Sequence, residues 1–199
     1  MKSPKSPPIA IGLRVKTGRA TAVILSGPAT APIVLARKTI RLYDPAIPES
    51  HQPYHAELEL PPTESARVVP RALKAVELVA LTSLRELVDE LRASRRSVCA
   101  IALVAGSATD PESIRNPHMR AHAREGQLFP HALGAAAKIL RIPATTIIEA
   151  DAFTKSATAL RKTPATIKNE IAELGRAVGK PWGTEEKTAA AAAWMVLAT

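Results

Sequence analysis

Four acidic residues and two pairs of histidines have the types and spacing that could do chemistry. Glu149 and Asp151 follow a short apolar run typical of a buried strand. Open α/β sheets place their ligands at the carboxyl ends of such strands. Glu185 and Glu186 stand at the start of the last predicted helix. Because carboxylates are ligands for Mg²⁺, the four residues are weak candidates for a catalytic metal cluster. Asp151 is also a natural N-cap for the helix that follows it.

The histidines form two His-x-x-x-His spacings. His118 and His122 would share one face of a helix and could ligate zinc. Pro53 interrupts the pair His51 and His55 and removes the helical geometry that this pair would need. Local spacing supplies no third ligand for either pair. We therefore interpret these histidines as solvated or hydrogen-bonded side chains and predict no metal site.

Basic residues dominate the first 43 positions, which hold eight Lys or Arg residues and no Asp or Glu. The whole chain has 27 basic and 18 acidic residues, so nearly all of its net charge of +9 lies in this segment. Clustered cations attract phosphate backbones through long-range fields and counterion release. The alternative is a protein that is merely basic. We expect nucleic acid to be bound by Arg14, Lys16, Arg19, Arg37, Lys38 and Arg41.

Length and composition set further bounds. A chain of 199 residues that is 46% hydrophobic can bury the core of one domain. It has neither an apolar run of about 18 residues nor an apolar segment behind its basic start, so we expect a cytoplasmic protein without membrane contact. Cys99 lies within an apolar run, which predicts a buried thiol. Aromatic residues make up only 3% of the chain, so duplex or branched nucleic acid is a better ligand than stacked single strands.

The expected elements begin with a disordered basic tail at residues 1–8. Two strands joined by a glycine-containing turn and a third strand at 33–42 predict an antiparallel unit. Five prolines within 44–62 predict a long irregular loop. The later elements are a helix that becomes regular after Pro70, a strand at 97–105 buried on both faces, a helix at 127–140, a short buried strand at 145–148, a helix from Pro164 to Val178 and a last helix from Thr184.

This order of elements matches that of the ribonuclease H-like fold, with one domain over residues 9–199. More specific signals lie in five segments: Gly12 to Lys16, Ala20 to Leu25, His131 to Ala136, Ile142 to Ile148 and Glu185 to Ala198. Through these segments the chain resembles the Holliday-junction resolvases of the RuvC type over most of residues 9–198. The resemblance implies an α/β architecture whose mixed five-stranded sheet has three antiparallel strands, then two parallel strands, and is flanked by helices. Resolvases of this type are dimers, so it also implies a homodimer.

In that family, four carboxylates on the first strand, the fourth strand and the last helix hold two Mg²⁺ ions. The matching positions here are Arg14, Val104, Glu185 and Thr188. A guanidinium ~4 Å from a dication would be unfavourable by roughly 8 kcal/mol at an effective dielectric of 20. We therefore predict no two-metal hydrolysis at this position and no cofactor. Arg14 could instead bind a phosphate, or pair with Glu185 or Glu186 in a filled former site.

These observations lead to a first hypothesis and two alternatives. The first is a non-catalytic protein with a RuvC-like fold that binds duplex or branched nucleic acid through a basic N-terminal sheet. The second is a divergent Mg²⁺-dependent endonuclease that uses Glu149, Asp151, Glu185 and Glu186 as relocated ligands. The third is a protein–protein interaction module that uses its sheet or the segment between His51 and Pro62.

Overall fold

The computed structural model describes residues 7–199, so residues 1–6 of the expected tail lie outside the described part of the chain. One sheet contains all the strands in this part, in the spatial order β3-β2-β1-β4-β5. β1 is antiparallel to β2 and β2 to β3, whereas β4 runs parallel to β1 and β5 parallel to β4. The predicted mixed sheet is therefore confirmed. The strands are β1 (Ile9–Lys16), β2 (Arg19–Ser26), β3 (Ile33–Arg41), β4 (Val98–Ala105) and β5 (Ala144–Ile148).

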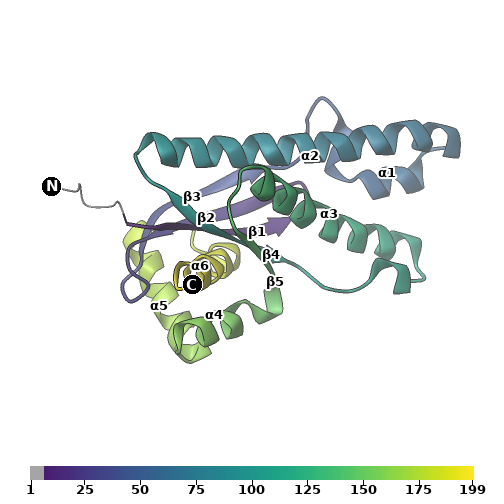
Figure 1. Cartoon of the computed structure of the whole chain (residues 1–199). Helices are drawn as coiled ribbons and strands as arrows, with labels where there is room; N and C mark the ends of the chain where they lie inside the picture. Colours follow the sequence, from purple (N-terminus) through teal and green to yellow (C-terminus); the bar gives the residue numbers. More distant parts are fainter. Residues whose placement is uncertain (1–6) are drawn as a thin grey trace.

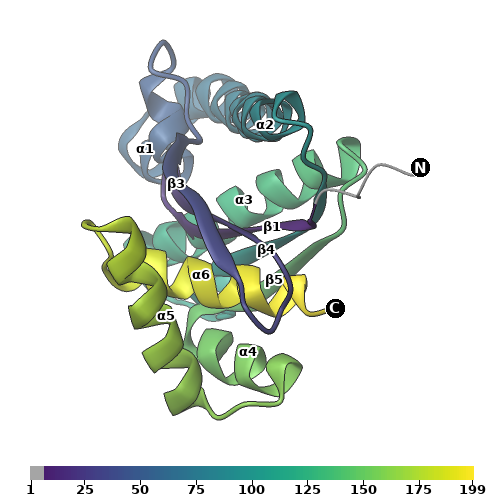
Figure 2. The ribbon, with the colours of Figure 1, turned by 90° about the vertical axis from the view of Figure 1, so that its left-hand side faces the viewer.

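Helices cover the two faces of this sheet as separate layers (Figures 1 and 2). The long helices α2 (Pro62–Ala93) and α3 (Pro117–Ile139) lie on one face, and α1 (Pro53–Glu59) packs against both. The other face carries α4 (Ala152–Leu160), α5 (Pro164–Val178) and α6 (Thr184–Leu197). Short 3₁₀ helices complete the chain: η1 (Pro48–His51), η2 (Pro111–Ser113) and η3 (Glu149–Asp151). No helix within residues 7–199 is long and apolar enough to cross a membrane.

The central strand β1 is buried on both sides, and its two faces have different shapes. Ile9, Ile11 and Leu13 point towards α2 and α3, because alternate side chains of a strand face opposite sides. On the opposite face the backbone of α6 lies against Gly12, since a Cβ atom added there would be 1.9 Å from the backbone oxygen of Ala189. The alanine-rich helix α6 therefore packs closely on β1, directly over the strand that carries Arg14.

Two predicted helix boundaries are wrong because prolines begin helices here. The segment 44–62 is not one irregular loop, since it contains η1 and α1 and leads directly into α2. Pro53 and Pro62 occupy the first turn of their helices, where the missing N–H would have no partner in any case. α3 begins at Pro117 and not near residue 127, and it continues through Pro130.

The edge of the sheet formed by β5 is more exposed than predicted. β5 is an edge strand, and Thr145 and Thr146 are exposed on it. Cys99 is also exposed, so the prediction of a buried thiol is wrong. The reason is the register, because β5 pairs with β4 only from Ile101 onwards and leaves the first residues of β4 without a neighbour on that side.

Candidate nucleic-acid interface

Three of the predicted basic residues form a row across neighbouring strands. Lys16 of β1 pairs with Arg19 of β2, and Arg19 pairs with Arg41 of β3. Directly paired residues share one face of a sheet, so these side chains leave the sheet on the same side. All three are exposed. We name Lys16, Arg19 and Arg41 the basic row.

The same register places Arg14 and Arg37 on the face of the basic row, which is the face that α6 covers. Arg37 pairs through Val23 with Gly12, the residue that touches α6. The side chain of Arg37 donates to the backbone oxygens of Lys180 and Pro181, just before α6. It therefore fixes the segment that leads into this helix, and a phosphate would have to displace those contacts.

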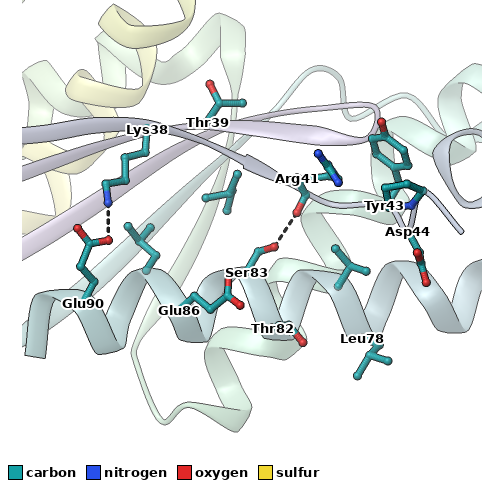
Figure 3. Close-up of a pocket in the computed structure, with 14 residues that line it drawn as sticks. Lys38, Thr39, Arg41, Tyr43, Asp44, Leu78, Thr82, Ser83, Glu86 and Glu90 are labelled. Atoms are coloured by element: carbon teal, nitrogen blue, oxygen red, sulfur yellow. Dashed lines mark hydrogen bonds and ion pairs between the residues drawn. The ribbon is translucent and has the colours of Figure 1, made fainter. Parts of the chain in front are cut away.

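Lys38 points to the opposite face of the sheet, because it follows Arg37 in the same strand. Its ammonium group pairs with Glu90 of α2, as Figure 3 shows. The groove of about 600 Å³ between β3 and α2 is lined by Lys38 and Arg41 together with Glu86 and Glu90. Opposite charges thus stand side by side in it, so this groove is not a uniformly positive surface and Lys38 does not extend the basic row.

Arg14 lies at the position that the family resemblance assigns to a metal ligand, and it is 2% exposed. Its Nε donates to Oε1 of Glu149 at 2.8 Å, and Nη2 pairs with the other carboxylate oxygen. Nη1 donates to the backbone oxygens of Val15 at 2.5 Å and Val104 at 3.3 Å. The guanidinium thus has protein partners on every nitrogen.

Of the two alternatives for Arg14, the pairing with Glu185 or Glu186 is wrong, because its partner is Glu149. Glu149 follows β5, and β1, β4 and β5 are parallel, so their carboxyl ends meet at one edge of the sheet. This geometry brings a carboxylate from the edge strand across Val104 to Arg14. The position that the resemblance assigns to a metal ligand is consequently occupied by a residue that is paired within the protein.

Glu185 lies at the start of α6 and binds the middle residue of the basic row. Its carboxylate accepts from Nη1 and Nη2 of Arg19 at 2.6 and 2.9 Å and from the Thr21 hydroxyl at 2.7 Å. The hydrogen bonds from Arg19 are the main cause that lowers the pKa of Glu185 from 4.5 to about 2, with smaller contributions from Thr21 and Lys16. Glu185 therefore stays ionised and offsets part of the positive charge of the row.

The remaining acidic candidates have separate partners. Glu186 accepts from the backbone N–H of Gly183 at 2.8 Å, as in a capping box at the start of α6. Asp151 lies 3.6 Å from the ammonium of Lys155, and its side chain does not make the predicted N-cap hydrogen bond. Among residues 7–199, none of the four carboxylates belongs to a group of three side chains that could share a metal ion. Thr188, at the last family position, donates instead to the backbone oxygen of Thr184.

The histidines are arranged differently from the prediction. His118 and His122 do share a face of α3, and the third side chain beside them is His55 from α1. His51, its predicted companion, instead packs its ring 4.8 Å from that of Tyr43. Sequence spacing could not predict that His55 joins this pair. The helix α1 lies in a proline-rich segment that was expected to be a loop, and it meets α3 only through the tertiary fold.

Comparison with known proteins identifies the fold of the chain but assigns it to no family. No protein-family model matches the chain, and no curated protein matches it. Among solved structures, Thermus thermophilus RuvC has a TM-score of 0.50 and 13% sequence identity over 94% of this chain and 92% of that chain. T. thermophilus RuvC in complex with a Holliday junction substrate has a TM-score of 0.49 and 14% identity over 94% and 90% of the two chains. The chain thus has the RuvC-like, ribonuclease H-like fold that its sequence predicts.

Proposed function

We propose that this protein binds the backbone of duplex or branched nucleic acid through the basic row and does not hydrolyse it. The observation that carries the proposal is that the exposed side chains of Lys16, Arg19 and Arg41 are aligned on one face of three neighbouring strands. The likeness of the fold to that of RuvC supports a nucleic acid as the ligand. The same likeness is the reason to expect a homodimer, which a measurement of molar mass in solution would test.

The dimensions of the basic row suit a phosphate backbone. Strands lie about 4.8 Å apart, so a row across three strands spans roughly 10 Å. A nucleic-acid strand carries one phosphate for about every 3.4 Å along the duplex axis, so such a row can meet two or three phosphates. Contacts to the backbone fix position without reading sequence, and we therefore expect little sequence preference.

The three residues of the row contribute unequally. Arg19 is held by Glu185 through two hydrogen bonds, so a phosphate has to compete with a carboxylate for this guanidinium. Arg41 has its guanidinium carbon 5.6 Å from the centroid of the Tyr43 ring, and this contact leaves its N–H groups available. We infer that Lys16 and Arg41 make the main contacts and that Glu185 restrains Arg19.

Binding without hydrolysis is supported by the neighbouring acidic groups. Arg14 occupies the first family metal position, and its charge is already met by Glu149. The candidate carboxylates each have a different partner and do not converge. A divalent ion in this place would require the buried ion pair to open, which is costly. The proposed function consequently needs no metal.

A salt titration of binding to a labelled four-way junction and to a duplex tests the proposal. The logarithm of the association constant should fall linearly with the logarithm of salt concentration, and the double substitution Lys16→Gln, Arg41→Gln should reduce the slope by about 2. Glu185→Gln should raise affinity, because it releases Arg19. Lys74→Gln, at an exposed position of α2, is the matched control and should leave the slope unchanged.

Two outcomes would refute the proposal. One is the absence of binding at low salt, which would favour the alternative of a protein–protein interaction module. The other is a double variant that binds as tightly, and with the same salt slope, as the unmodified chain. In that case nucleic acid would bind elsewhere and the basic row would be incidental.

A further inference from the structure

Three imidazole rings from two helices meet on the side of the sheet that carries α2 and α3. His118 and His122 lie one turn apart on α3, and their Nε2 atoms are 3.1 Å from each other. The ring of His55 in α1 lies with its centroid 4.7 Å from that of His118 and 4.3 Å from that of His122. One ring nitrogen of each histidine lies within 4.8 Å of the other two.

A buried carboxylate orients His55 within this cluster. Nδ1 of His55 lies 2.9 Å from Oε1 of Glu125, and the backbone N–H of His55 donates to the same oxygen at 3.2 Å. Glu125 has no exposed surface. An ionised carboxylate can only accept, so the proton of this hydrogen bond lies on Nδ1, and in the neutral imidazole Nε2 of His55 is then the nitrogen with the lone pair. This Nε2 is buried and has no hydrogen-bond partner among the residues that the structure describes.

The hydrogen bonds within the cluster do not account for this arrangement. His118 and His122 can satisfy each other, because one Nε2 can donate a proton to the other. His55 stays unsatisfied in that scheme, although most buried polar atoms in proteins have a partner. Oε2 of Glu125 is also buried without a hydrogen-bond partner among the residues that the structure describes. A cation at the centre of the three rings would give Nε2 of His55 a partner and place a positive charge near the buried carboxylate.

We propose that His55, His118 and His122 bind one divalent transition-metal ion, for which Zn²⁺ is the best fit. Zinc accepts neutral imidazole nitrogens at about 2.0 to 2.1 Å, which in tetrahedral geometry places the nitrogens roughly 3.4 Å apart. The 3.1 Å between His118 and His122 is close to this value. A carboxylate bonded to the far nitrogen of a histidine ligand, as Glu125 is to His55, is the usual support of such sites. Mg²⁺ is excluded as the resident ion, because it prefers oxygen ligands.

The site would connect two parts of the chain that are distant in sequence. α1 belongs to the proline-rich segment before α2, whereas His118 and His122 belong to the first turns of α3. A shared ion would therefore fasten α1 to α3 and stabilise their packing. His118 and His122 are exposed, so the fourth coordination position is open to water. This inference does not depend on the proposed binding of nucleic acid.

Calorimetric titration of the metal-free full chain with Zn²⁺ tests the inference. We expect one ion per chain, and Co²⁺ in its place should give the intense visible absorption of a tetrahedral nitrogen site. The double substitution His118→Asn, His122→Asn should abolish this binding. Glu125→Gln should weaken it by about 10- to 100-fold, as loss of a supporting carboxylate does. Zn²⁺ should also raise the melting temperature of the unmodified chain but not that of the double variant.

The controls are His131→Asn, at an exposed position of the same helix, and His51→Asn, in the same segment as His55. Both should bind Zn²⁺ as the unmodified chain does. The inference is overturned if the unmodified chain binds no Zn²⁺, or if the double variant binds it with equal affinity. His118 and His122 are exposed, so their loss leaves the fold intact and the double variant decides the matter even where Glu125→Gln fails to fold.

Discussion

Arg14 illustrates how burial and pairing decide what a charged side chain can do. Its guanidinium is 2% exposed, and its partners are Glu149 and two backbone oxygens. A buried charge is tolerated only when it is paired and hydrogen-bonded, and this one meets both conditions inside the protein. The residue therefore acts in folding, and it differs in this respect from the exposed cations of the basic row.

We predict that the two halves of this ion pair are unequal in their effect on stability. Glu149→Ala leaves a fully buried guanidinium without its anion and should lower the free energy of unfolding by about 3 kcal/mol. Arg14→Met should cost less, since the Glu149 side chain is 33% exposed and can be hydrated. Urea unfolding of both variants measures the difference. Glu173→Ala, which breaks an exposed pair with Arg176, is the control and should change stability by no more than about 0.5 kcal/mol. Equal effects of all three substitutions would contradict the prediction.

Glu185 gives a prediction of pH dependence. Its pKa is lowered from 4.5 to about 2 in the folded protein, chiefly by the hydrogen bonds from Arg19. A carboxyl group with a lowered folded pKa contributes stability above its unfolded pKa and loses that contribution as the pH falls through the folded value. Because Arg19 is about half exposed, solvent screening limits the contribution to about 1 kcal/mol.

The measurement compares the unmodified chain with Glu185→Gln in urea at several pH values. The unmodified chain should be more stable at pH 7, and the difference should disappear between pH 4.5 and about 2. A difference that persists unchanged below this range would show that packing, and not the charge of Glu185, is responsible.

At the scale of elements, the contact between β1 and α6 is the tightest constraint on the sheet. Gly12→Ala would place a Cβ 1.9 Å from the backbone oxygen of Ala189, so one of the two backbones must move. We expect a loss of about 2 to 3 kcal/mol in the free energy of unfolding. Gly126→Ala is a matched control in α3, because a Cβ there meets no atom within 4 Å.

The control should even increase stability, by roughly 0.5 to 1 kcal/mol, since alanine loses less conformational entropy than glycine in a helix. Thermal unfolding of the two variants checks the opposite signs. A Gly12→Ala protein as stable as the unmodified chain would mean that α6 can shift away from β1 without cost.

Local patterns predicted those elements whose signals lie within the element itself. Thr163 before α5 and Pro164 at its first position mark its start, and Thr163 does accept from the backbone N–H of Thr166. Predictions that depend on the neighbouring elements in the fold were wrong. The residues next to Cys99 in the sequence are apolar, as for a buried residue. Its side chain is exposed, because β5 does not extend along β4 as far as Cys99. The segment that contains the starts of α1 and α2 is as rich in proline as a loop. Its prolines nevertheless stand at the first turns of the two helices, where proline favours helix initiation.

The candidate site was predicted only in part for the same reason. Strand pairing in a simple hairpin is local, so the sequence could place Lys16 and Arg19 together. The partner of Arg14 depends on the order of β1, β4 and β5 in the sheet, which no local pattern contains. His55 likewise reaches His118 and His122 only through the packing of α1 on α3.

At the scale of the whole molecule, the segment between β3 and α2 adjoins both proposed sites. His51 in η1 packs against the turn at Gly18, between the strands that carry Lys16 and Arg19. His55 in the next helix belongs to the histidine cluster. The two proposals nevertheless have separate tests, because one is measured with nucleic acid and the other with a metal ion alone.

The last prediction concerns hydrolysis by the whole protein. We expect no cleavage of a four-way junction or a duplex in the presence of Mg²⁺ or Mn²⁺. Two-metal catalysis needs several carboxylates to hold the ions that stabilise the attacking and leaving oxygens, and Glu149 and Glu185 are bound to Arg14 and Arg19 instead. A gel assay for nicked or linear products measures the outcome under salt conditions in which the DNA is bound.

Cleavage that is lost in Glu149→Gln or Glu185→Gln would contradict this prediction and support a nuclease with relocated carboxylates. Cleavage lost only in the double variant of His118 and His122 would instead point to the histidine cluster, whose open coordination position could hold a reactive water. The two families of variants therefore separate an acidic centre from an imidazole centre. Because Arg14 is buried against Glu149, binding of the DNA alone is not expected to open the ion pair and free a carboxylate for a metal ion.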